Sequence, residues 1–82
     1  MILVDIYIPF LDQTYDFQVD ENVPVENLIM EIVEMVGNET RLKINLSAEN
    51  FMLCSMEQNV ILKKSSTLLF YGIKNGSKLM LV

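Results

Sequence analysis

The sequence predicts a single α+β domain over residues 1–82, in which one main helix covers one face of a mixed sheet of four to five strands. Two observations carry this prediction. Apolar residues recur at every second position near both ends of the chain, which is typical of strands with one buried face. Between them, residues 25–36 change to a helical period. A length of 82 residues is the size of one domain.

Two strands open the chain. Residues 2–8 place β-branched apolar side chains at every even position, and Pro9 ends the strand because proline cannot donate a hydrogen bond to a sheet. Residues 15–19 alternate in the same way. The short connection between these segments predicts an antiparallel hairpin.

The main helix is predicted to begin at Val25, directly after Pro24, because proline suits the first turn of a helix. Gly37 and Asn38 predict its end. Its core-facing stripe is expected to contain Val25, Leu28, Ile29, Ile32, Val33, Met35 and Val36.

The remaining elements are short. Residues 51–54 and 60–62 predict a third and a fourth strand, residues 67–73 a buried short turn of helix, and residues 79–82 a final strand. Asn75 and Gly76 predict a turn before that last strand.

Residues 38–50 allow two interpretations, and the register of the third strand stays open with them. Leu42, Ile44 and Leu46 alternate with polar residues, so the segment forms either a short strand or an extended crossing.

Composition excludes several functions. Six basic and eleven acidic residues give a net charge of −5, which repels nucleic acid and anionic membrane surfaces on average. The chain contains no histidine and a single cysteine, Cys54, so we expect no catalytic site, metal site or cofactor. No apolar run approaches the about 20 residues that span a membrane, so direct membrane insertion is not expected.

The order strand–strand–helix–strand–strand–short helix–strand is that of the β-grasp fold, with the first and last strands parallel at the sheet centre. In detail, the chain resembles ubiquitin-like proteins, and more closely the EsaB/YukD family of bacterial type VII secretion systems. The resemblance rests on residues 14–19, on Pro24 to Ile29, and on Leu68 with residues 71–79. Residues 37–50 are longer than the usual connection in that family.

The resemblance implies a non-catalytic, cytoplasmic accessory of the secretion machinery that partners recruit to the inner face of the membrane. Its expected partner is a membrane component of the machinery or its ATPase. A self-associating adaptor unrelated to secretion, such as a homodimer, is the alternative. No glycine follows Gly76, so the Gly-Gly tail of conjugated modifiers is missing from this sequence, and we do not expect conjugation.

The candidate site follows from the strand pattern. If one face of each strand packs on the helix, the outward positions of the first, third and last strands carry apolar residues in unusual number. Neighbouring strands would gather them into one patch around Asp5, and contiguous exposed apolar surface often marks an interaction site. The expected partner-binding residues are Leu3, Tyr7, Met52, Cys54, Met80 and Val82.

Overall fold

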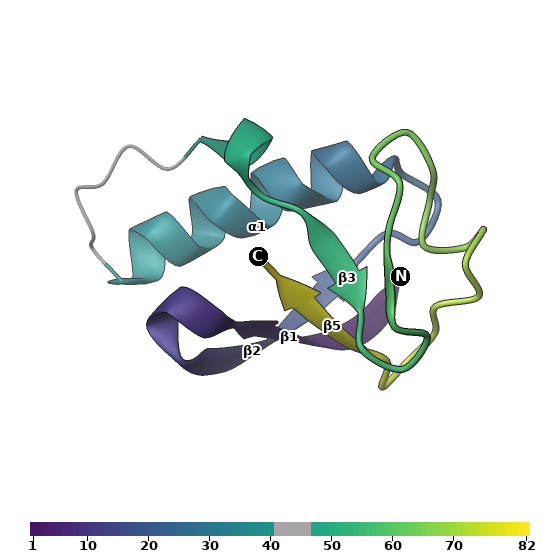
Figure 1. Ribbon diagram of the computed structural model, residues 1–82, viewed down its shortest axis with the longest axis horizontal. Helices are drawn as coiled ribbons and strands as arrows, with labels where there is room; N and C mark the ends of the chain where they lie inside the picture. Colours follow the sequence, from purple (N-terminus) through teal and green to yellow (C-terminus); the bar gives the residue numbers. More distant parts are fainter. Residues whose placement is uncertain (41–46) are drawn as a thin grey trace.

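The computed structural model describes residues 1–40 and 47–82, and it has the predicted α+β architecture (Figure 1). Its elements, in chain order, are β1 (Ile2–Ile8), the short 3-10 turn η1 (Pro9–Leu11), β2 (Gln13–Val19), α1 (Val25–Thr40), the 3-10 turn η2 (Ala48–Asn50), β3 (Leu53–Ser55), β4 (Val60–Ile61) and β5 (Lys78–Leu81).

The five strands form one mixed sheet in the order β2-β1-β5-β3-β4. β1 pairs with β5 in parallel, and the other neighbours pair antiparallel. This confirms the hairpin at the start of the chain and the central pairing of the first and last strands. The third-strand register, which the sequence left open, places Leu53 opposite Leu81.

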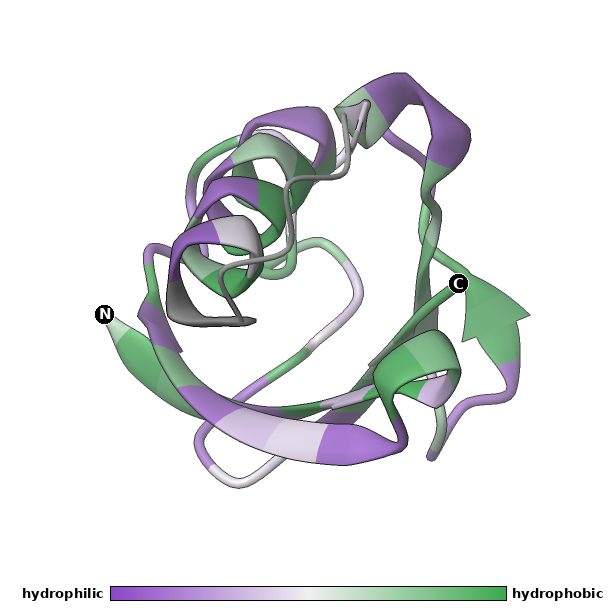
Figure 2. Ribbon diagram, turned by 90° about the vertical axis from the view of Figure 1, so that its left-hand side faces the viewer, coloured by the Kyte–Doolittle hydropathy of each residue, from purple (hydrophilic) through white to green (hydrophobic). Residues whose placement is uncertain are grey.

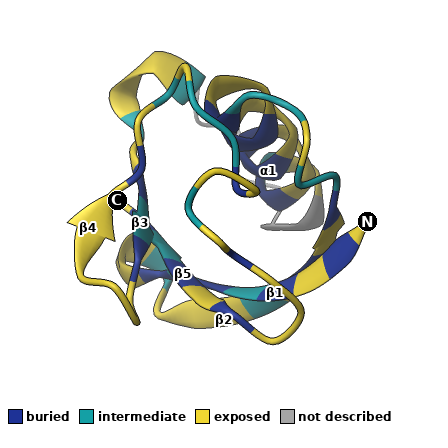
Figure 3. Cartoon of the chain, turned by 90° about the vertical axis from the view of Figure 1, so that its right-hand side faces the viewer, coloured by how far each residue is buried: buried dark blue, intermediate teal, exposed yellow. Residues whose placement is uncertain are grey.

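The sheet curves around α1, which lies on its concave side (Figure 2). The core lies between the sheet and α1, and it consists of the inward side chains of the sheet and the buried stripe of the helix. Along β1 the burial alternates residue by residue, as Figure 3 shows, because successive side chains of a strand point to opposite faces. The side chains that are at most 1% exposed include Val4, Ile6, Ile8, Val25, Leu28, Ile29, Ile32, Leu53, Leu68, Leu79 and Leu81.

The loop that precedes β5 closes the N-terminus of α1. The first backbone N–H groups of a helix have no partner within it. Here the N–H of Val25 donates to the carbonyl of Ser66 at 2.8 Å, and the N–H of Glu26 donates to the carbonyl of Lys64 at 3.0 Å. Pro24 also forms an isolated bridge with Thr67. These contacts fix the loop of residues 64–67 against the first turn of the helix.

Two details of the predicted helix are wrong. The helix passes through Gly37 and Asn38 and continues to Thr40. A glycine inside a helix costs only about 1 kcal/mol relative to alanine, which the buried Val33 and Val36 beside it can offset. Met35, predicted in the core, is 53% exposed. Met35 lies at the edge of the apolar stripe, between the helix face that packs on the sheet and the face that is exposed to solvent.

The later elements also differ from the prediction. β3 begins at Leu53, two residues after the predicted start. Residues 67–73 form hydrogen-bonded turns and no helix. Leu68 and Ile73 are buried as expected, but the carbonyl of Leu68 accepts from the N–H of Ile73, and Gly72 has a left-handed φ of 70°, which stops helical winding.

The structure describes only part of residues 38–50, the segment for which the sequence allowed two interpretations. The possible strand through Leu42, Ile44 and Leu46 lies outside the described residues. On its C-terminal side, η2 brings Ala48 against the core beside α1.

Candidate protein-binding surface

One row of side chains crosses the outer face of the sheet through all five strands. The strand registers place Tyr7 opposite Thr14 on one side and Met80 on the other, and place Met80 opposite Cys54. Cys54 is in turn opposite Ile61 on β4. Four of the five residues in this row are apolar or aromatic, so the row forms a continuous apolar band away from the helix.

A second apolar pair extends the band toward the C-terminal end of β5. The backbones of Met52 and Val82 exchange two hydrogen bonds, of 2.7 and 2.9 Å, so their side chains are neighbours. Met52 is 43% exposed and Val82 is 40% exposed. Tyr7, Cys54 and Met80 are half-buried against one another on the same face. Five of the six sequence-predicted site residues are therefore brought together.

Leu3 lies apart from the other five predicted residues. It is 50% exposed on the outer face of β1, but Asp5 lies between it and Tyr7. Four residues of strand correspond to about 13 Å. On the side of β1 that faces β5, the neighbour of Leu3 is Gly76, whose N–H donates to the Leu3 carbonyl. Gly76 has no side chain that could connect Leu3 to the patch. A role for Leu3 in binding stays a prediction.

Two residues of this face were missed by the sequence analysis. Ile61 is 59% exposed and Met56 is 49% exposed, and both line a shallow hollow with Cys54 and Met80. A signal for Ile61 was present, because an inward Leu62 in the predicted fourth strand requires an outward neighbour. Met56 follows β3 in a turn, where alternation gives no direction. We define the outer-face patch as Tyr7, Met52, Cys54, Met56, Ile61, Met80 and Val82.

A polar row borders the outer-face patch. Asp5 stands directly opposite Asp16 on β2 and opposite Lys78 on β5. A hydrogen bond with the Asp5 carboxyl, the negative charge of Asp5 and slight desolvation together raise the pKa of Asp16 above its ordinary value. Two carboxylates in register on adjacent strands repel when both are ionised. The patch thus has an electrostatically unfavourable edge at neutral pH.

We expect Asp16→Asn to raise the Tm at neutral pH, and we expect the gain to shrink as the pH falls toward 3.8, the ordinary pKa of aspartate. Because folding raises the pKa of Asp16, the folded chain binds this proton more tightly, so the stability that the protonated Asp16 contributes is present below pH 3.8 and is lost as the pH rises above that value through the raised pKa. Thermal unfolding across pH measures the difference. Glu34→Gln, an exposed change on the helix, is the control, and an equal gain there would point to net charge alone.

The two ionisable side chains of the patch, Cys54 and Tyr7, both have raised pKa values and are protonated at neutral pH. Burial raises the pKa of the Cys54 thiol, so the thiol stays protonated and is a weak nucleophile. The Tyr7 hydroxyl donates a hydrogen bond to the Asp12 carboxylate at 3.0 Å, and this bond raises the pKa of Tyr7. What the surface offers is apolar contact area with a polar border.

Two further features concern the described part of the chain. Among the described side chains, those of residues 1–38 and 47–82, no group of three or more histidine, cysteine, aspartate or glutamate residues could hold a metal ion. In the helices that the structure describes, there is no segment with the length and apolar character that a bilayer-spanning helix needs.

Comparison with solved structures defines the class of the fold. The ubiquitin-like domain of Dsk2 from Plasmodium falciparum aligns with a TM-score of 0.77 at 18% identity, covering 99% of this chain and 95% of that one. A ubiquitin-like domain of an Arabidopsis thaliana protein aligns with a TM-score of 0.74 at 21% identity, covering 99% of this chain and 74% of that one. The fold is therefore ubiquitin-like.

The particular family follows from the sequence itself. Residues 3–81 match the family model described as WXG100 protein secretion system (Wss), protein YukD. The chain belongs to the YukD family, which confirms the resemblance and the association with type VII secretion. The comparison with curated proteins gives no match.

Proposed function

We propose that this protein is a non-catalytic adaptor of a type VII secretion system, and that its outer-face patch binds a cytosolic domain of a membrane component or of the ATPase. Membership of the YukD family supports the setting. The observation that carries the binding mode is the apolar band through Tyr7, Met80, Cys54 and Ile61, which runs across the four neighbouring strands β1, β5, β3 and β4.

The composition of the patch supports a protein partner. Methionine side chains are flexible and polarizable, so they adapt to the shape of an apolar partner surface. Tyr7 adds a rigid ring with a polar end, a residue type that is enriched at the centres of interfaces. The pair Asp5 and Lys78 at the border supplies charges of both signs, which would fix the orientation of a docked domain.

The chemistry of the chain agrees with this role. The sequence has no histidine to act as a general base, and the single thiol, Cys54, is kept protonated by burial. The free energy available from this surface is that of burying apolar area, at about 25 cal/mol per Å² before the costs of association. Such a surface suits holding a partner in place in the cytoplasm, at the inner face of the membrane.

Met52→Glu tests the proposal. We expect it to weaken binding to the purified cytosolic domain of the secretion ATPase, or of a membrane component, by at least about tenfold, because an unpaired carboxylate would be buried in the interface. The measurement is isothermal titration calorimetry with each purified domain. The change should leave the fold intact, because surface substitutions usually alter stability by less than about 0.5 kcal/mol.

The matched control is Met35→Glu, which makes the same substitution at a similarly exposed methionine on the helix side. It should bind as the wild type does. Equal loss in both variants would contradict a role for the outer-face patch. If no purified component binds the wild type, and sedimentation shows a dimer that Met52→Glu dissociates, the self-associating alternative replaces the adaptor.

A further inference from the structure

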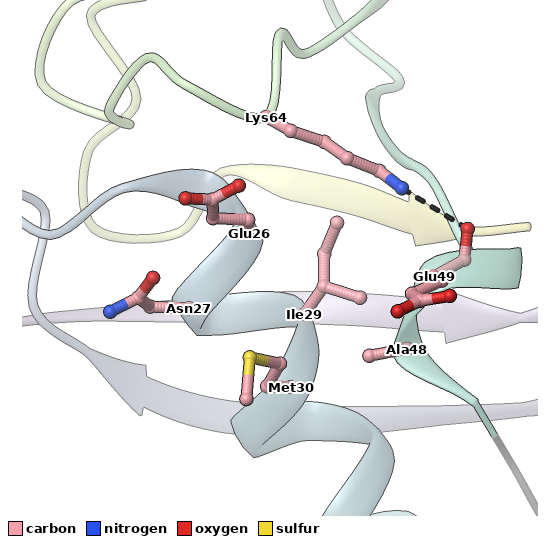
Figure 4. Close-up of a pocket in the computed structure, with 7 residues that line it drawn as sticks. All are labelled: Glu26, Asn27, Ile29, Met30, Ala48, Glu49 and Lys64. Atoms are coloured by element: carbon pink, nitrogen blue, oxygen red, sulfur yellow. Dashed lines mark hydrogen bonds between the residues drawn. The ribbon is translucent and has the colours of Figure 1, made fainter.

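A groove lies on the other side of the molecule, between the first turns of α1 and η2 (Figure 4). Ile29, only 1% exposed, forms its floor, and Ala48 forms one wall. Met30 stands at the rim with 60% of its surface exposed, although it lies on the otherwise polar face of the helix. The groove volume is about 210 Å³. Pockets for whole small-molecule ligands begin near about 300 Å³, so this one fits one or two inserted side chains.

The rim of the groove is acidic. Glu26 on α1 and Glu49 on η2 lie on opposite sides of it, and both are exposed. Of the rim residues that the structure describes, the one cation is Lys64, which donates from Nζ to the backbone carbonyl of Glu49 at 3.3 Å. Among the described residues, neither carboxylate at the rim has an ion-pair partner. Lys64 therefore holds η2 in place, and its single charge offsets only one of the two glutamates at the rim.

The same sign of charge continues along the helix. Glu31 and Glu34 are exposed on the outward face of α1, and the sequence of the helix, residues 25–40, contains no lysine or arginine. Exposed helices usually mix charges, since opposite charges three or four residues apart stabilise a helix and like charges destabilise it. Within the part of the chain that the structure describes, no ion pair offsets these carboxylates, and an acidic face beside an apolar groove attracts a cationic partner.

We propose that this groove, which we call the α1–η2 groove, binds a basic amphipathic segment of a partner protein. A long apolar side chain of that segment would enter between Met30 and Ala48, over Ile29. Its lysine or arginine side chains would pair with Glu26 and Glu49 at the rim. The net charge of −5 steers such a segment toward the protein at long range.

The α1–η2 groove and the outer-face patch can be occupied together. The groove is lined by residues of α1 and η2, and α1 lies on the concave side of the sheet (Figure 2), whereas the patch consists of side chains on the opposite face. Binding at the groove does not depend on the function proposed for the patch. A protein with both sites occupied would bridge two partner segments that do not touch each other.

The experiment uses the full chain and a defined probe, an 18-residue amphipathic helical peptide of leucine and lysine. An otherwise identical peptide with glutamate in place of lysine serves as the second probe. We expect the lysine peptide to bind, and its backbone amide shifts in NMR titration to concentrate on Glu26, Asn27, Ile29, Met30, Ala48 and Glu49. We expect the glutamate peptide to produce no shifts at these residues.

Matched variants separate the groove from the overall charge. Glu26→Lys should weaken the binding of the lysine peptide by roughly fivefold, because a favourable charge at the rim becomes repulsive. Asp16→Lys makes the same charge change on the opposite face and should alter affinity less than about twofold. Met30→Ala, which changes no charge, should weaken binding a few-fold through lost apolar contact.

Three results would overturn the proposal. In the first, the amide shifts map to the outer-face patch. In the second, Glu26→Lys and Asp16→Lys weaken binding equally, which would reduce the effect to net charge. In the third, the shifts at the groove appear on concentrating the protein alone, which would make a second copy of this chain the occupant. None of these results affects the Met52→Glu test of the patch.

Discussion

Leu79→Ala should destabilise the protein by about 2–5 kcal/mol, which is the range measured for leucine-to-alanine changes in packed cores. Leu79 is fully buried in β5, between Ile6 on β1 and Ser55 on β3. Its side chain therefore meets both neighbouring strands as well as the core under α1. A small domain has only about 5–15 kcal/mol of total stability, so the variant should lose more than roughly 10 °C in Tm.

Leu69→Ala is the matched control. Leu69 is 59% exposed, and its structural contact is through the backbone, since its N–H donates to the carbonyl of Glu21. Removing the side chain should change the Tm by no more than about 2 °C. Chemical denaturation of both variants checks the comparison. Similar losses at both positions would contradict the burial of the Leu79 side chain as the source of the effect.

The sequence predicted the central elements because their patterns are long and depend on one period. β1 alternates over seven residues, and its buried face is fixed by Ile2, Val4, Ile6 and Ile8. The central position of β5 followed from the order of elements. The end of α1 could not be predicted, because Gly37 breaks helices by local preference while Val33 and Val36 hold this turn by tertiary packing.

The candidate site was predictable where strand alternation determines the outward direction. It placed Tyr7, Met52, Cys54, Met80 and Val82 on one face, and the structure makes them neighbours. Leu3 has the same orientation but stands apart, because the residue beside it is Gly76, in the turn before β5, which has no side chain to extend the patch. A sequence pattern fixes which face a residue occupies, whereas strand register decides which residues meet.

The α1–η2 groove had no signal in the sequence. Met30 was visible as one apolar residue on a polar helix face, which is common on protein surfaces. Its meaning depends on η2, whose residues Ala48 and Glu49 are distant in sequence and show no periodic pattern. Only the tertiary structure places that turn against the first turns of the helix.

Gly76→Ala should destabilise the protein by about 1–2 kcal/mol, the cost of a left-handed backbone for a residue with a Cβ. Gly76 has a φ of 83°, and an added Cβ would meet no atom within 4 Å. The effect is therefore one of backbone conformation without a steric clash. We expect the Tm to fall by roughly 5–15 °C. The Tm of Gly76→Asn should fall less than that of Gly76→Ala, because asparagine adopts the left-handed conformation more readily than alanine does.

The turn at Gly76 matters because it sets the register of β5 against β1. The Leu3 N–H donates to the Asn75 side chain at 2.8 Å, the Gly76 N–H donates to the Leu3 carbonyl at 2.9 Å, and the Asp5 N–H donates to the Ser77 carbonyl at 3.0 Å. A slip of one residue would move every side chain of β5 to the other face. These three bonds therefore keep Leu79 in the core and Met80 in the outer-face patch.

This dependence gives the Gly76 variants a second measurement. If Gly76→Ala only strains the turn, the remaining folded protein keeps the register, and the amide shifts of Tyr7, Cys54 and Met80 stay as in the wild type. If the register slips, the shifts of these three residues change together while those of α1 remain. Equal Tm losses for alanine and asparagine would contradict the backbone explanation. A loss of register would instead show that one turn holds both the core and the binding face in place.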